Sequence, residues 1–229
     1  MDSSNYQPIC VTVWLRTPVV SDDWLPLDGA LLACRTREDK GAQALTIPGA
    51  STSAQPKGDP MQGGRLPIKI VHGKEWYYRC SWAVWGPHVD GKDHWHKRFD
   101  THLADMVNFQ GRRGRVIIEQ DSYKAYRMPV YYRSALWVHW YMVADLDKIG
   151  HLLIAITHLG KKTSQGWGRV LRWQVEPCEA DWSIWQDNRL MRGVPLRDYP
   201  KDRQPDKVGL YGVRPSYWDK RNQVELALP

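Results

Sequence analysis

Residues 145–177 read DLDKIGHLLIAITHLGKKTSQGWGRVLRWQVEP, and two different periods meet within this stretch. The first half repeats apolar residues at helical spacing, on a stripe formed by Leu146, Ile149, Leu152, Leu153, Ile156 and Leu159. Asp145 precedes this stripe and is suited to cap the start of a helix. The second half alternates, with Arg169, Leu171, Trp173 and Val175 on one side, which is typical of a strand. The stretch therefore predicts a helix, a glycine-rich turn and a strand.

The turn between helix and strand, residues 160–168, combines glycine, positive charge and an aromatic ring. Glycine adopts positive φ easily and has no side chain to keep a ligand away. Successive free N–H groups in such turns bind phosphate oxygens, and cations strengthen that binding. The candidate ligand-binding residues are Lys161, Lys162, Ser164, Gln165, Gly166, Trp167, Gly168 and Arg169. The plain alternative is a helix C-cap at Gly160 followed by a solvated basic loop.

A nucleotide-binding P-loop is excluded, although "GKKT" is similar to the end of that motif. A P-loop follows a strand, precedes a helix and has four residues between its glycines. This turn has the opposite order and a different glycine spacing.

Outward from this stretch, the remaining periodic segments complete an α+β pattern. A buried strand is predicted at residues 135–143, and Ile9, Val11, Val13 and Leu15 alternate as a half-buried strand does. A helix is predicted by a second stripe, formed by Leu27, Ala30, Leu31 and Cys34. A hairpin follows, and one face of its second strand carries Trp76, Tyr78, Cys80, Trp82 and Val84. If one strand of the hairpin is left out, the predicted strands and helices follow the β-α-β-β-α-β order of the ferredoxin-like (RRM-like) fold.

The predicted organisation has four parts. Residues 1–84 form the first part of the core, with a long loop at 40–65, and residues 134–177 form the second part. Residues 85–133 form a basic insertion, read as a ribbon-like arm. From Lys92 to Arg133 it has nine Lys and Arg against five Asp and Glu, so its net charge is 9 − 5 = +4. Residues 178–229 form an irregular tail that wraps the surface.

Composition narrows the classes of partner. The 32 Lys and Arg against 25 Asp and Glu give a net charge of +7, which favours an anionic partner. Among the 13 Trp and 11 Tyr, most serve packing, and a few are available to stack on bases. The four cysteines lie far apart and form no CxxC pair, which excludes a zinc ribbon. Without a signal peptide or a long apolar run, we expect a cytoplasmic protein with no membrane partner.

The histidines give only weak indications of metal binding or of acid–base catalysis. His94 and His96 would share one face of a strand, but no closing ligand has the spacing of a zinc site, so we expect no metal and no cofactor. His139 lies in an apolar strand and is read as a core histidine. His158, beside the glycine turn, is the fallback candidate for acid–base cleavage of RNA. No acid–base pair can be placed from spacing, so catalysis is not expected.

The helix, glycine-rich basic turn and final strand resemble the repeat-associated (RAMP) superfamily of CRISPR proteins. Four blocks, WLPLDGALLA, THLGKKTSQGWGRVLRWQVEP, PLRDYP and GVRPSYW, resemble the type IV CRISPR effector subunit of the Cas-five kind. The resemblance covers residues 11–38 and 137–218 and is weak over 40–130.

The resemblance implies a non-catalytic subunit of a ribonucleoprotein used in defence against viruses and plasmids. Such a subunit binds the 5′ handle of the guide RNA and caps a filament of Cas-seven-type backbone subunits. It joins them to a large, Cas-eight-like PAM-side subunit for RNA-guided DNA targeting, and target DNA is a further candidate partner. By position, the loop residues named above would hold the handle, and the insertion with Arg112, Arg113 and Arg115 takes the place of the thumb. A guide-RNA-processing endoribonuclease of the same superfamily and a general single-strand binder are the alternatives.

Overall fold

The computed structural model describes residues 5–40, 66–73, 75–106 and 124–229 of the chain. The predicted loop therefore lies outside the described residues from residue 41 to 65, as do Arg112, Arg113 and Arg115. The helices are α1 (Leu27–Lys40) and α2 (Leu146–Ile154), with short 3₁₀ helices at Thr101–Met106, Thr163–Gln165, Leu196–Asp198 and Lys220–Asn222. The strands are β1 (Tyr6–Leu15), β2 (Ile70–Val71), β3 (Tyr77–Tyr78), β4 (Val84–Trp85), β5 (His88–Lys97), β6 (Tyr126–Ala135), β7 (Trp137–Asp145), β8 (Val170–Pro177), β9 (Trp185–Gln186), β10 (Arg189–Leu190), β11 (Val194–Pro195), β12 (Val208–Gly212) and β13 (Gln223–Ala227).

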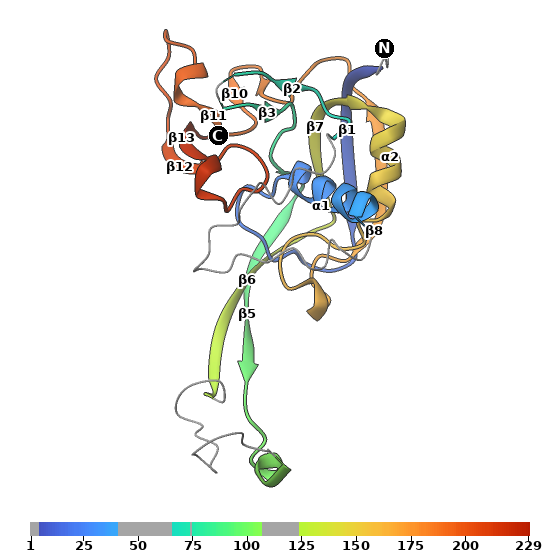
Figure 1. The fold of residues 1–229 in the computed structure, drawn as a ribbon, viewed down its shortest axis with the longest axis vertical. Coiled ribbons are helices and arrows are strands. Elements are labelled where there is room, and N and C mark those ends of the chain that lie inside the picture. The colour runs from blue at the N-terminus through green and yellow to red at the C-terminus, as the bar shows by residue number, and fades with distance from the viewer. Residues whose placement is uncertain (1–4, 41–65, 74, 107–123) are drawn as a thin grey trace.

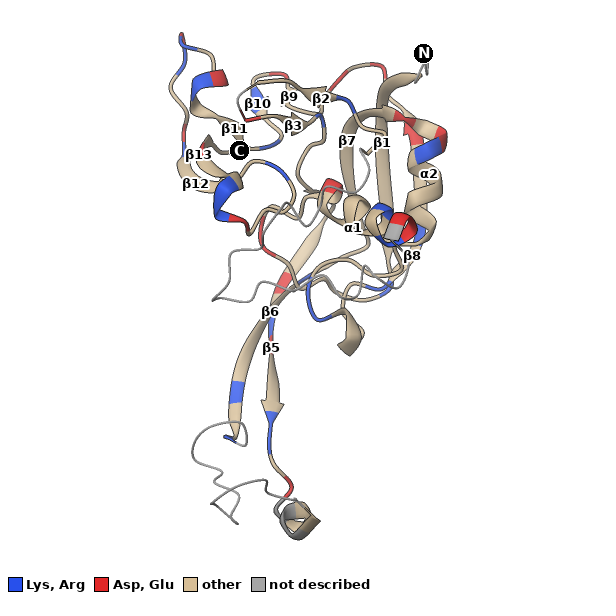
Figure 2. Ribbon diagram, viewed as in Figure 1, with Lys and Arg blue, Asp and Glu red and all other residues tan. Residues whose placement is uncertain are grey.

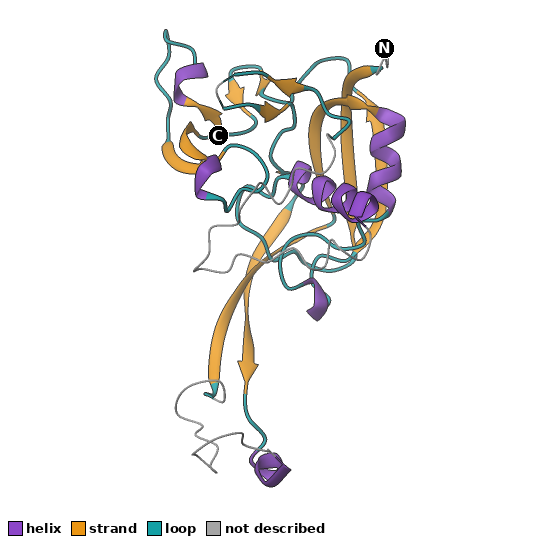
Figure 3. Cartoon of the chain, in the orientation of Figure 1, coloured by secondary structure: helices purple, strands orange, loops and turns teal. Residues whose placement is uncertain are grey.

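The main sheet is antiparallel and has the strand order β4-β7-β1-β8. Both helices cover the same face of it, where β1 and β7 contribute their buried apolar side chains to one core (Figure 1). Ile9, Val11 and Val13 of β1 are fully buried, as the alternation predicted. The predicted α+β class is confirmed, and the described strands pair in antiparallel fashion (Figure 3).

Helix α2 begins where the sequence predicted and ends earlier than expected. The side chain of Asp145 accepts a hydrogen bond from the backbone N–H of Lys148, at 3.2 Å. The last residue of the helix is Ile154, and Ala155 is its C-cap, so the predicted C-cap at Gly160 is wrong. Beyond Ala155 the chain pairs with the residue just before β8, through the bridge between His158 and Arg169. Ile156 and Leu159 therefore stay in the core although they lie outside the helix.

The predicted hairpin is only partly formed. β2 pairs with β3, whereas β4 joins the edge of the main sheet. Between β3 and β4 the chain changes partners, because Ser81 N–H donates to the carbonyl of Tyr141 and Trp82 N–H donates to that of Met191. Tyr78 and Cys80 pack in the main core, but Trp82 belongs to a second apolar cluster. The prediction that these side chains share one face of a single strand is therefore wrong.

Strands β5 and β6 form a long two-stranded ribbon, which we call the arm. They pair from His88 and Ala135 at the base to Lys97 and Tyr126 farther out. The arm projects away from the body of the protein (Figure 1). It separates β4 from β7 in the chain, which is where the sequence predicted an inserted ribbon.

The tail contains more regular structure than the sequence predicted. After β8, three short strands form a sheet in the order β11-β13-β12, and Leu226 and Val213 are buried in a cluster of their own with Trp82. The expectation of an irregular tail is wrong because strands of two to five residues are too short to show a period. None of the helices in the described ranges is long and apolar enough to cross a membrane.

Candidate nucleic-acid interface

A short stretch after β1, residues 17–22, joins the glycine loop (residues 160–168) to the arm; we call it the linking segment. On one side, Lys161 N–H donates to the carbonyl of Val20 at 2.6 Å. On the other side, Val19 and Arg133 of β6 exchange two backbone hydrogen bonds of 2.9 Å. Backbone pairing on both sides fixes the loop against the base of the arm. We call the resulting region the corner.

The three glycines of the loop have different physical roles. Gly160 and Gly168 have φ of +79° and +68°, and an added Cβ would lie 2.4 Å from the Val20 carbonyl oxygen and 1.9 Å from that of Leu159, respectively. Close backbone packing therefore requires both of them. Gly166 also has positive φ, at +87°, but apart from its two chain neighbours no atom of the described residues lies within 4 Å of its added Cβ. Of the three, Gly166 is the glycine that faces open space.

The amides of Gly166 and Gly168 are engaged within the protein. Gly166 N–H donates to the carbonyl of Thr163 at 3.0 Å, and Gly168 N–H donates to that of Pro18 at 2.7 Å. The hydroxyl of Thr17 accepts from Arg169 N–H and donates to the Gly166 carbonyl, both at 2.8 Å. The predicted use of free glycine amides for phosphate is therefore wrong at Gly166 and Gly168. An anion at this corner therefore cannot use the amides of Gly166 and Gly168 without breaking these hydrogen bonds.

The two adjacent lysines have different partners. Lys161 Nζ lies 2.6 Å from a carboxylate oxygen of Asp22, and both side chains are exposed. Exposed ion pairs contribute little free energy, so another anion can replace Asp22 at low cost. Lys162 adopts a left-handed backbone conformation with φ of 57°, which is uncommon for a side-chain-bearing residue. Its Nζ lies 4.9 Å from the centroid of the Trp95 ring on β5. Arg169, the third cation, is exposed.

Trp167 is supported by an aromatic residue of the arm. Its ring centroid lies 5.1 Å from that of Tyr132, with 32° between the planes. Tyr132 pairs with Gly91, where an added Cβ would lie 2.3 Å from the Tyr132 ring. The ring of Tyr132 can thus cross the ribbon and reach the loop. Sequence reasoning missed Tyr132 and Trp95; a glycine within a strand signals such a close approach.

An open cleft of about 380 Å³ lies between the arm and the glycine loop. Its lining comes from both regions: Asp93, His94, Trp95, Val130, Gln165 and Trp167. Two predicted site residues, Gln165 and Trp167, therefore face the same cleft as the arm. Ser164 is exposed on the loop near them in sequence.

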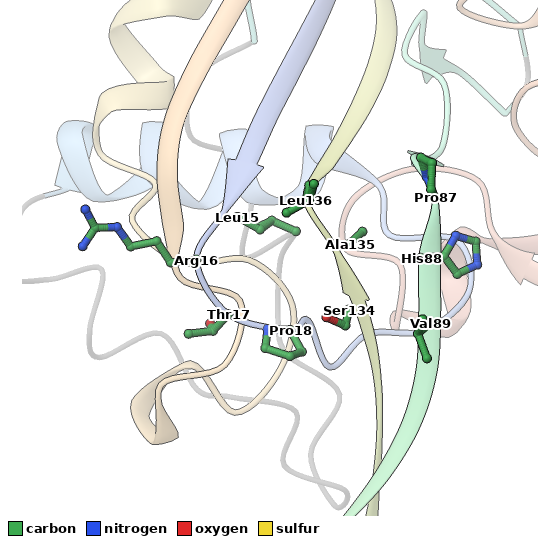
Figure 4. Close-up of a pocket in the computed structure, with 10 residues that line it drawn as sticks. All are labelled: Leu15, Arg16, Thr17, Pro18, Pro87, His88, Val89, Ser134, Ala135 and Leu136. Carbon is green, nitrogen blue, oxygen red and sulfur yellow. The ribbon is translucent and has the colours of Figure 1, made fainter.

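A second cleft, of about 350 Å³, lies at the base of the arm (Figure 4). It is lined by residues 15–18, 87–89 and 134–136, and most of these side chains are apolar. Val89 and Leu136 are 71% and 72% exposed. In Figure 4 the Arg16 guanidinium points away from the arm. This cleft has no aromatic ring except that of His88, so it is less suited to stacking with a base.

Cations are spread along the arm as well as the loop (Figure 2). Lys92 lies over the ring of Tyr131, and Arg127 donates to Nδ1 of His94 at 3.1 Å. Loss of hydration at the His94 ring, together with the charge of Arg127, lowers its pKa. Arg133 hydrogen-bonds Asp90 at 2.8 Å and thereby lowers the pKa of that carboxyl group.

The histidines singled out in the sequence have different surroundings in the structure. His158 Nδ1 lies 3.0 Å from the Thr157 hydroxyl, a neutral group. The His94 and His96 rings are neighbours at 6.4 Å, but among the described residues no group of three His, Cys, Asp or Glu is arranged to hold a metal ion. His139 packs between Trp137 and Tyr141, and burial lowers its pKa.

A comparison with protein families matches residues 88–229 to the model described as CRISPR type IV associated protein Csf3. The match covers more than half of the chain and begins at the first residue of the arm. It includes the glycine loop and the tail blocks PLRDYP and GVRPSYW. No curated protein matches the chain at a significant level.

Proposed function

Because the chain belongs to the family of CRISPR type IV associated protein Csf3, we propose that it is the guide-RNA handle-binding subunit of a type IV effector complex. In this role it binds the 5′ handle, caps the filament of Cas-seven-type subunits and contacts the Cas-eight-like PAM-side subunit. It acts without catalysis or a cofactor, in the cytoplasm, during RNA-guided DNA targeting.

The observation that carries this proposal is the joining of loop and arm by the linking segment. As a result, Trp95 of the arm and Trp167 of the loop line one cleft although they are far apart in sequence, and Lys162 lies over the Trp95 ring. Binding of single-stranded RNA needs both, because cations hold the phosphates and rings stack on the bases. The corner supplies both on a backbone fixed by hydrogen bonds.

The loop residues have different roles in RNA binding, which follow from the chemistry of their side chains. Lys161, Lys162 and Arg169 contact phosphates, and Ser164 and Gln165 donate neutral hydrogen bonds. Gly166 gives the RNA room to approach, and Trp167 offers the ring face that Tyr132 leaves uncovered. Gly168 acts indirectly, by allowing the loop to fold against Leu159.

The fold is consistent with this family role. We assign the core to the ferredoxin-like class of the RAMP superfamily. The strand order β4-β7-β1-β8, with helices after β1 and β7, supports the assignment. We equate the arm with the thumb of that superfamily. Arg112, Arg113 and Arg115 lie between β5 and β6 in the sequence, outside the described residues.

The salt dependence of RNA binding tests the role of the two lysines. The probe is single-stranded RNA with the handle of the CRISPR repeat that accompanies this protein, and its dissociation constant is measured over a series of salt concentrations. Each lost phosphate contact makes the slope of log affinity against log salt shallower by about one unit. We expect Lys161→Ala and Lys162→Ala each to have this effect, and Lys201→Ala, at an exposed tail lysine, to have none.

An unchanged slope in the double variant Lys161→Ala/Lys162→Ala would contradict the proposal. Equal affinity for a scrambled RNA would instead indicate a general single-strand binder. The same samples are expected to contain intact RNA. Specific, metal-independent cutting that disappears in His158→Ala would favour the endoribonuclease.

A further inference from the structure

The cleft between the arm and the glycine loop has the lining expected for a flat, aromatic ligand. Two indole rings, Trp95 and Trp167, come from its two sides, and Val130, only 4% exposed, adds a buried apolar surface. Its volume of about 380 Å³ falls within the range of about 300–1,000 Å³ typical of small-molecule pockets. This space suits one nucleobase and part of its sugar better than a stacked pair of bases.

The polar groups of the cleft favour a base edge over a phosphate. Asp93 presents a carboxylate, which only accepts hydrogen bonds and repels phosphate. One of its oxygens accepts from His94 N–H at 2.7 Å, which fixes the side chain. Gln165, on the other side, both donates and accepts. Amino and ring N–H groups of a base are the partners that match Asp93.

Lys162 lies against one of the two rings of this cleft. Its ammonium group lies over the face of Trp95, at 4.9 Å from the ring centroid. A base that stacks on this face competes with the ammonium group for the same surface. A phosphate of the same nucleotide is a stronger partner for Lys162, because both groups carry full charges.

From this geometry we propose that the cleft holds one unpaired nucleobase of single-stranded RNA. The base stacks on Trp95 beside Trp167, its edge donates to Asp93, and Lys162 moves from the ring to the neighbouring phosphate. The inference rests on the proposed RNA-binding function and adds a base-binding residue on the arm. Recognition of the handle then requires the arm as well as the glycine loop.

Abasic scanning combined with a double-mutant cycle tests this assignment. The probe is the handle RNA described above, in which each nucleotide in turn lacks its base, and binding to the full chain is measured. Loss of stacking in Trp95→Ala is expected to weaken binding of the intact RNA by about 5- to 100-fold. We also expect the scan to identify one nucleotide, the one whose base occupies the cleft. Removal of that base should weaken RNA binding to the unaltered protein but not to the Trp95→Ala variant.

Two variants control for altered folding. Tyr131→Ala changes a 64% exposed ring on the opposite face of the arm and should show no such coupling. Trp95→Leu keeps an apolar side chain without the stacking surface and should behave as Trp95→Ala does. RNA binding without any nucleotide coupled to Trp95 would overturn the base pocket and leave the proposed function in place. Failure of the unaltered protein to bind the handle would contradict both.

Discussion

Asp28, in the first turn of α1, is a buried carboxyl group that connects the core to the tail. It is 1% exposed and accepts hydrogen bonds of 2.7 Å from the Tyr217 hydroxyl and of 2.9 Å from Gly29 N–H. Asp28 and Tyr217 belong to the blocks WLPLDGALLA and GVRPSYW, which are far apart in the chain. Their contact gives both blocks a structural role, independent of RNA.

The burial of Asp28 predicts a pH-dependent stability. Burial raises its pKa above the ordinary 3.8, against the opposing effects of Arg192 and Tyr217. Between 3.8 and the raised pKa, the folded protein keeps a proton that the unfolded chain has released. The stabilisation from this group is therefore complete below 3.8 and is lost as the pH rises through the folded-state pKa.

Urea unfolding of the protein and of Asp28→Asn over a pH series measures this contribution. We expect the free energy of unfolding to fall, relative to Asp28→Asn, as the pH rises from about 4, and then to level off. The difference between the two proteins isolates Asp28 from the other groups that titrate in this range. If the difference in unfolding free energy between the protein and Asp28→Asn did not change with pH, the raised pKa of Asp28 would be contradicted.

The glycine loop is an element held by backbone packing, which two matched substitutions distinguish. Gly168→Ala would place a methyl group against the Leu159 carbonyl, whereas Gly166→Ala would place one in open space, and both have positive φ. We expect Gly166→Ala to cost about 1–2 kcal/mol of unfolding free energy, from backbone conformation alone. Gly168→Ala should cost several kcal/mol, because the backbone must move. Equal costs in urea unfolding would contradict this account of the loop.

Elements with a long, regular period could be predicted from the sequence. β1, α1, the start of α2 and β8 follow the alternation and stripes because each presents one apolar face to the same core. The short strands of the tail were missed, since their stability comes from contacts such as that of Leu226 with Val213 and Trp82. No local pattern contains that information.

The candidate site could be predicted only in part. The glycine loop was found because its charges and its ring are adjacent in sequence. Thr17 and Pro18, which accept hydrogen bonds from the amides of Arg169 and Gly168, come from the other end of the chain. The same holds for Trp95 and Tyr132, whose contacts with Lys162 and Trp167 arise only when the linking segment draws the arm and the loop together.

At the scale of the whole molecule, the tail and the core are joined by a buried guanidinium group. Arg192 is 1% exposed and donates to the carbonyls of Tyr78, Cys80 and Val213. The arm, by contrast, extends away from both (Figure 1). In the described part of the chain, the core and tail therefore form one body from which the ribbon projects, and the corner lies at the root of that ribbon. A partner that binds at the corner therefore contacts both the body of the protein and the arm.

The central claim is that this corner binds the leading end of the guide RNA. Photocrosslinking within the assembled effector complex tests it most directly, with thiouridine placed at single handle positions and crosslinked peptides identified by mass spectrometry. The account predicts crosslinks in residues 160–169 and at Trp95 from handle positions, and none from positions late in the guide. Handle crosslinks confined to the helix-free face of the main sheet or to the tail would contradict it.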